Sequence, residues 1–190
     1  MPDLISVMIN VGQIAPIFIM VLQGLSILAG TYLVASSLID FYLTTNDNSS
    51  KMFSSNSKVS VGGASVKLIV GGFLVGLGTL QVVGIFSRSL TGDYVNSRMM
   101  SYSTSGTSIA EQAQLAVLAL LSIMQAVGMS AIYRGFWALV ERHNGNQQGN
   151  SYARIAGWFI GGLLAWNFKW TSDVVNNQLG FNIISILTPF

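Results

Sequence analysis

The sequence predicts an all-α integral membrane protein with about four transmembrane helices, forming two helical hairpins preceded by an N-terminal interfacial helix. Hydrophobic residues make up 51% of the 190 residues and charged residues only 8%, whereas a soluble domain carries about a quarter charged residues. The apolar residues gather in long runs, and a bilayer core about 30 Å thick requires roughly 20 helical residues. Because only polar loops separate these runs, residues 1–190 are expected to form a single membrane domain.

The residues before the first long apolar run are predicted to form a short helix at the membrane interface. Leu4 and Met8 contribute to its apolar side, and Pro16 is expected to kink the chain into the first spanning helix. The first charged residue is Asp3, and no lysine or arginine precedes Lys51. A secretory signal peptide begins with a basic region, so this segment is not expected to be one.

Four apolar runs are predicted to cross the membrane, namely residues 17–39, 66–86, 115–133 and 155–170. Asp40 closes the first run and Arg134 follows the third. The fourth run is short and lies between Arg154 and Lys169, so it is expected to span by thinning the bilayer or by snorkelling of its ends. The last apolar stretch, residues 179–190, is too short to cross and is expected to lie in the interface or on the bundle.

The basic residues predict the orientation. Lysine and arginine are enriched in cytoplasmic loops. One side of the predicted bundle, with its helix flanks, carries Lys51, Lys58, Lys67, Arg134, Arg142 and Arg154. The opposite side carries Arg88, Arg98 and Lys169. The first set is therefore expected to be cytoplasmic, and both termini periplasmic.

A weak internal repeat relates the two predicted hairpins. Residues 71–77 and 157–163 share a glycine, a phenylalanine, an aliphatic residue, a glycine and a leucine in register, and residues 25–28 resemble residues 121–124. A duplicated hairpin would explain both similarities. Chance agreement is the alternative, because small and aliphatic residues are common in membrane helices.

Two pairs of glycines have the spacing of close helix packing. Gly72 and Gly76 are four residues apart in the second run, as are Gly157 and Gly161 in the fourth. Apolar surface does not drive helices together in lipid, so flat glycine faces that admit a neighbouring backbone gain importance. These faces are predicted to serve either a subunit interface with lipid-embedded partners, including copies of the chain, or packing within the bundle.

Polar residues inside the predicted spans are few. Gln81 and Gln125 are the two intramembrane candidates. They are expected to form interhelical hydrogen bonds, and lining a pore is the alternative. No ionisable residue falls clearly at mid-bilayer, where proton relays and ion-coupled transporters place them.

The residues needed for catalysis or for metal binding are largely absent from the sequence. It has no cysteine and one histidine, His143, which is a poor basis for a metal site. It has no nucleophile elbow and no phosphate-binding loop of Walker type. We therefore expect no enzymatic activity and neither a cofactor nor a metal. Because the basic residues are scattered, direct nucleic-acid binding is not expected either.

The order of several short motifs resembles a known family. In chain order these motifs are Gln13-Ile14-Ala15-Pro16, Gly30-Thr31-Tyr32, Ile39-Asp40-Phe41-Tyr42, the glycine-rich residues 71–84, and Gly161-Gly162-Leu163-Leu164-Ala165-Trp166-Asn167. The sequence resembles the IcmC/DotE/TraQ family of small inner-membrane proteins of type IVB secretion systems and IncI-type conjugation machines.

This resemblance implies a non-enzymatic structural subunit of the bacterial inner membrane that contacts other secretion or conjugation subunits and acts through helix packing and oligomeric assembly. Two alternatives remain. The first is a pilin-like subunit of a conjugative filament, which four spans and the absence of a cleavable leader disfavour. The second is a small pore-forming or transport protein with Gln81 and Gln125 along its path.

Overall fold

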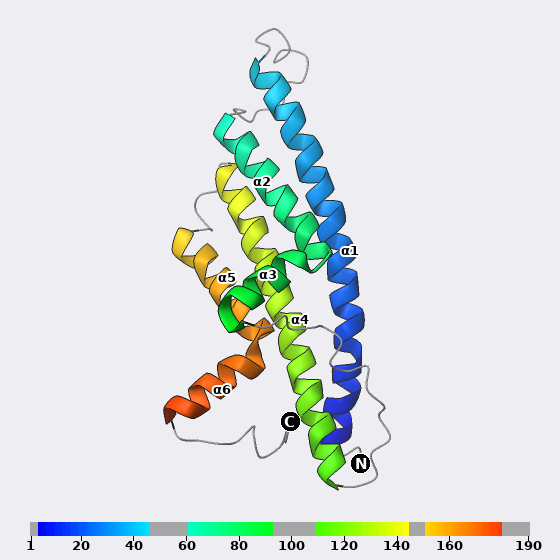
Figure 1. The fold of residues 1–190 in the computed structure, drawn as a ribbon. Helices are drawn as coiled ribbons and strands as arrows, with labels where there is room; N and C mark the ends of the chain where they lie inside the picture. The colour runs from blue at the N-terminus through cyan, green and yellow to red at the C-terminus, as the bar shows by residue number, and fades with distance from the viewer. Residues whose placement is uncertain (1–3, 46–60, 93–108, 145–150, 180–190) are drawn as a thin grey trace. The chain divides into compact units, whose positions relative to one another are not determined.

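The computed structural model describes residues 4–45, 61–92, 109–144 and 151–179, and the regular structure in these ranges is entirely α-helical (Figure 1). In chain order the helices are α1 (Leu4–Thr45), α2 (Val61–Gly78), α3 (Gln81–Thr91), α4 (Ile109–His143), α5 (Tyr152–Trp166) and α6 (Phe168–Leu179). The predicted all-α class is therefore confirmed. The apolar tail predicted over residues 179–190 lies almost wholly outside the described residues.

Three of these helices are long and apolar enough to cross a membrane, which indicates a membrane protein. The candidate spans are Ser6–Thr45, Val61–Gly78 and Leu115–His143. They contain the first and third predicted runs and much of the second. The 15 residues of α5 rise about 22 Å at 1.5 Å per residue, which is less than the bilayer core.

Helix α1 is continuous, so the expected separate interfacial helix is not found. The helix runs for 42 residues with Pro16 inside it. Proline removes one backbone hydrogen bond, the one to the carbonyl of Gly12, and apolar residues lie directly on both sides of it. In lipid a helix that ended here would expose further backbone groups, and continuing the helix keeps those groups bonded.

The second predicted span, residues 66–86, is not one helix, because α2 ends at Gly78 and α3 begins at Gln81. Leu80 adopts a φ of 60°, a left-handed conformation that a right-handed helix cannot accommodate. The Leu80 N–H donates to the Leu77 carbonyl at 3.0 Å and so tightens the last turn. Beyond this turn α3 is amphipathic, with Val83 and Ser87 on its buried side.

The fourth predicted span, residues 155–170, is also divided. Helix α5 ends at Trp166 and α6 begins at Phe168. The Leu163 carbonyl accepts two hydrogen bonds from Asn167, one from its backbone N–H and one from its side-chain amide, each at 3.0 Å. Both halves of the chain thus have the same succession, a long helix, a shorter apolar helix, a break and a short amphipathic helix.

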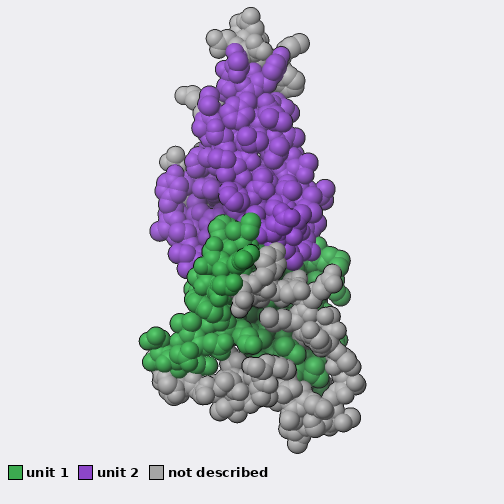
Figure 2. Space-filling view, viewed as in Figure 1, with its two compact units in different colours: residues 1–21, 83–130, 161–190 green, residues 22–82, 131–160 purple. Residues whose placement is uncertain are grey.

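The described residues form two compact units (Figure 2). Unit 1 comprises residues 1–21, 83–130 and 161–190, and unit 2 comprises residues 22–82 and 131–160. Helices α1 and α4 contribute residues to both units. Whether residues 1–190 behave as a single membrane domain stays a prediction.

Each unit has an apolar core drawn from several helices. In unit 1 the buried residues include Ile19, Val83, Ala119, Met129 and Trp166. In unit 2 they include Leu33, Leu74, Leu77, Ile132 and Phe136. The ring of Phe136 stacks on Phe73 of α2 and contacts the edge of Phe159 of α5, with centroid distances of 5.6 and 4.7 Å. This aromatic cluster joins α2, α4 and α5 within unit 2.

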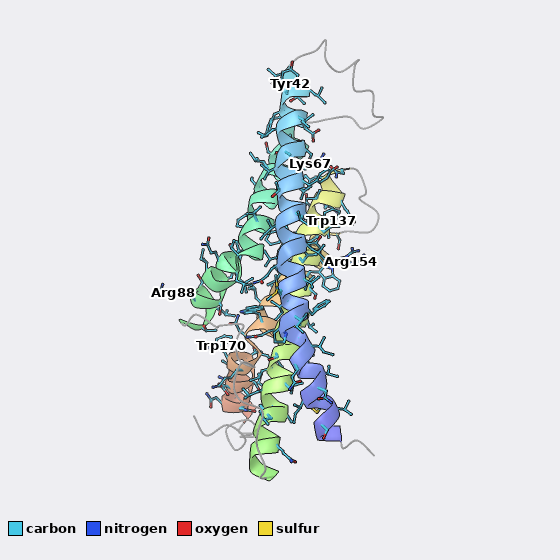
Figure 3. The ribbon with its side chains drawn as sticks, turned by 90° about the vertical axis from the view of Figure 1, so that its right-hand side faces the viewer. Tyr42, Lys67, Arg88, Trp137, Arg154 and Trp170 are labelled. Atoms are coloured by element: carbon cyan, nitrogen blue, oxygen red, sulfur yellow. The ribbon has the colours of Figure 1, made fainter. Side chains whose placement is uncertain are left out.

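The outward surface of the helices is also apolar. Large hydrophobic side chains of α1 point away from the protein along much of its length (Figure 3). Met20 and Leu28 are each 70% exposed, and Ile17 is 63% exposed. A soluble monomer rarely presents a continuous apolar surface of this extent. A lipid-facing helix requires such a surface, in agreement with the membrane assignment.

Candidate functional site

The closest helix contact in unit 2 lies between α1 and α2 and depends on glycine. A Cβ atom on Gly30 would lie 2.6 Å from the Gly71 carbonyl oxygen and 2.8 Å from the Val75 nitrogen. A Cβ atom on Gly78 would lie 2.8 Å from the Gln23 carbonyl oxygen. All three of these neighbours are backbone atoms, which cannot rotate away. Gly30, Gly71 and Gly78 therefore let the two backbones meet along this face.

Unit 1 contains a matching contact between α4 and α5. A Cβ atom on Gly128 would lie 2.6 Å from both the Gly162 carbonyl oxygen and the Trp166 nitrogen. The N-terminal part of α1 packs on α4 in the same way, since a Cβ on Gly12 would lie 2.6 Å from the Cα of Ala119. Both hairpins thus use a glycine of the long helix against the shorter helix that follows.

The predicted packing glycines do not form these contacts. A Cβ atom on Gly72, Gly157 or Gly161 would meet nothing within 4 Å among the residues described, and one on Gly76 would meet only the side chain of Val82. Packing within the bundle instead uses the glycine beside the predicted one. Gly71 precedes Gly72 and Gly162 follows Gly161, and one residue corresponds to a rotation of about 100° around the helix.

The two predicted intramembrane glutamines lie in different surroundings. Gln125 of α4 is only 2% exposed, whereas Gln81, the first residue of α3, is exposed. Gln125 belongs to unit 1, together with three further buried polar side chains, those of Ser87, Ser122 and Asn167. The structure does not bring the two glutamines together in one described unit.

A hydrogen bond between α3 and the break after α5 organises part of this polar group. The Ser87 hydroxyl donates to the Oδ1 atom of Asn167. Both side chains are at most 1% exposed. The Thr171 hydroxyl of α6 lies 3.1 Å from the carbonyl oxygens of Leu164 and Asn167. Asn167 therefore joins α3 and α6 to the end of α5 through hydrogen bonds. Breaking a hydrogen bond in a buried site is costly because no water is available to replace the partner.

The hydroxyl of Ser122 and the indole nitrogen of Trp166 are buried polar atoms of unit 1 without a hydrogen-bond partner among the described residues. Ser26 and Ser130 show the usual alternative, since each donates to the carbonyl four residues earlier at 2.7 Å. A buried donor without an acceptor costs about 1–3 kcal/mol, so these two atoms are exceptions that need a physical explanation.

Unit 2 contains a charged pair between α1 and α2. The Nζ atom of Lys67 lies 2.7 Å from the Oδ2 atom of Asp40, and the two side chains are 21% and 16% exposed. Asp40 lies near the end of α1 and Lys67 near the start of α2. On a helix side chains tilt toward the N-terminus, which directs Lys67 toward the carboxylate of Asp40.

The described residues offer no evident site for a metal ion. They contain no group of three or more histidine, aspartate or glutamate side chains that could hold one. The single histidine, His143, is exposed at the end of α4, where its Nδ1 atom lies 3.0 Å from the Leu139 carbonyl oxygen. The arrangement that the geometry offers is therefore one of close helix packing and buried hydrogen bonding.

The packing glycines at Gly71 and Gly162 and the Ser87–Asn167 bond were missed from the sequence. A double glycine is visible at each position, but nothing in the sequence distinguishes the inward glycine from the outward one.

Comparison of the chain with models of protein families, with curated proteins and with solved structures gives no match.

Proposed function

We propose that this chain is a non-enzymatic structural subunit of a bacterial inner-membrane machine of the type IVB secretion or conjugation class, and that it acts by packing its helices against copies of itself or partner subunits. The observation that carries the proposal is the outward glycine face of α5. Gly157 and Gly161 lie four residues apart with open space beside them, while the adjacent Gly162 contacts α4. The family resemblance supplies the class of machine.

The neighbours of these glycines favour a helix as the occupant. Ala153, four residues before Gly157, is also exposed, so three small residues follow one another along α5. Trp158 and Ile160 beside them are 40% and 60% exposed. In lipid, small residues let a second helix approach closely while large neighbours fill the flanks.

An assembly assay with leucine substitutions tests this proposal. Gly161→Leu places a large side chain on the outward face and is expected to abolish co-purification of differently tagged copies and of partner subunits, while membrane insertion persists. Ala156→Leu is the matched control, because Ala156 is exposed on the same helix but one residue off the glycine line. Unchanged co-purification of partners and copies by Gly161→Leu would refute the assembly role.

We further propose four crossings, with α5 and the start of α6 as the fourth, and both termini in the periplasm. The chain has no cysteine, so single cysteines at Ser54, Ser103, Asn146 and Asn177 report sidedness directly. Ser54 and Asn146 are expected to react from the cytoplasm, and Ser103 and Asn177 from the periplasm. Labelling of Asn146 and Asn177 from the same side would remove the fourth crossing.

One observation favours a pore or transport role as the second candidate. Gln125 is one of four buried polar side chains of unit 1, and intramembrane polar groups often mark solute paths. Reconstituted liposomes test this candidate. Solute flux that depends on Gln125 and is lost in Gln125→Leu would support it, and no flux from the isolated chain would exclude it.

A further inference from the structure

The outward face of α4 carries one unusual residue, Arg134. Its side chain is exposed, and no hydrogen bond, ion pair or ring contact joins it to another residue in the described part of the chain. Arg134 is therefore a charged side chain on the outward surface of unit 2.

Arg134 lies before the C-terminal end of α4, within unit 2. The Arg142 guanidinium lies 3.9 Å from the centre of the Tyr152 ring, where α4 ends and α5 begins. Arg134 lies eight residues earlier, or about 12 Å along the helix axis. Arg134 lies inside the candidate span Leu115–His143. Hydrocarbon solvates a guanidinium poorly, so the group requires either a phosphate drawn toward it or a carboxylate from another helix.

The residues around Arg134 favour the phosphate. Tyr133 and Trp137 flank it on α4 and stack on each other with centroids 6.5 Å apart, and such aromatic side chains gather at the level of lipid headgroups. Trp137 is labelled in Figure 3. Arg142 and Arg154 add positive charge to unit 2, and basic residues near a membrane surface attract anionic lipid.

We propose that Arg134, flanked by Tyr133 and Trp137, binds the phosphate of an anionic phospholipid on the outward face of α4. The guanidinium offers a planar fork of donors that fits two phosphate oxygens. Its long aliphatic stem remains in the hydrocarbon while the charged end reaches toward the headgroup. This site is separate from the glycine face of α5, and its occupation does not require assembly of the chain.

Native mass spectrometry of the full chain in a neutral detergent tests the proposal, with phosphatidylglycerol and phosphatidylcholine as the added lipids. Wild type is expected to prefer phosphatidylglycerol, and Arg134→Gln to lose about fivefold of that preference, as expected for one basic residue near an anionic surface. Arg134→Lys should keep part of it. Arg88→Gln, which removes an exposed arginine of α3, is the matched control and should retain the wild-type preference.

Three outcomes would overturn the proposal. The first is an unchanged preference in Arg134→Gln whose helical content equals that of wild type. The second is displacement of phosphatidylglycerol by inorganic phosphate, which would identify free phosphate as the ligand. The third is loss of a co-purified protein, with no change in bound lipid, which would assign Arg134 to a carboxylate of a partner. Gly161→Leu should retain the lipid preference even where assembly fails.

Discussion

Replacing either of two adjacent glycines of α2 with alanine should change the stability of the protein by different amounts. A Cβ atom on Gly71 would lie 2.8 Å from the Cγ2 atom of Val34 and 2.9 Å from the Gly30 carbonyl oxygen, both shorter than the ordinary contact distance of 3.4–4 Å. Helices α1 and α2 would have to separate, and overpacking of this kind costs about 1–3 kcal/mol. A Cβ atom on Gly72 meets nothing within 4 Å.

Helix propensity contributes equally to the two variants and therefore cancels in the comparison. Alanine is favoured over glycine in a helix by about 1 kcal/mol, and both positions lie inside α2. Gly72→Ala should thus be up to about 1 kcal/mol more stable than wild type. Gly71→Ala should be less stable than Gly72→Ala by the cost of the contact alone, about 1–3 kcal/mol.

Unfolding of the purified chain by sodium dodecyl sulfate in a mild detergent, followed by circular dichroism, measures both free energies. Gly24→Ala on α1 serves as a control, because a Cβ there also meets nothing within 4 Å, and it should behave like Gly72→Ala. Equal stability of Gly71→Ala and Gly72→Ala would show that α1 and α2 do not approach as closely as the structure has them.

Three further predictions concern contacts inside one unit and use the same unfolding assay. Lys67→Met removes the hydrogen-bonded partner of the partly buried Asp40 carboxylate and should cost about 1.5–3 kcal/mol. Stability should recover when Asp40→Lys is combined with Lys67→Asp; no recovery would argue against pairing. Ser87→Ala removes the donor to a buried amide oxygen and should cost about 1–3 kcal/mol, whereas Ser122→Ala should leave the stability unchanged or raise it, because it removes a buried hydroxyl without a partner among the described residues. Equal costs of the two serine variants would contradict this assignment. Phe136→Ala removes the centre of the aromatic cluster and should cost about 3–5 kcal/mol; a loss below about 1 kcal/mol would mean that the rings do not pack together.

The apolar runs allowed much of the helical structure to be predicted. The runs at residues 17–39 and 115–133 lie inside α1 and α4, because a long apolar segment in lipid must bond its own backbone and a helix does so within one segment. The helix boundaries were harder to predict. The break between α2 and α3 depends on the left-handed conformation of Leu80, which leucine rarely adopts.

The candidate site was only partly predictable. Gln125 was identified as an intramembrane polar residue, and the structure buries it. The pairing of Ser87 with Asn167 was not predicted, because this hydrogen bond joins residues 80 positions apart. No local pattern encodes such a pairing, which exists only once α3 and the end of α5 meet.

Composition and the length of the apolar runs were enough to predict a helical protein with an apolar outward surface, because they set the cost of placing a backbone in lipid. Which glycine of each pair faces a neighbouring helix became evident only from the packing of the helices. Gly71 and Gly72 are the same residue type with the same helix propensity. They differ in the direction they face, by about 100° around the helix axis. That difference places one against the backbone of α1 and leaves the other open, since contact depends on the distance to a neighbour that the local sequence does not contain.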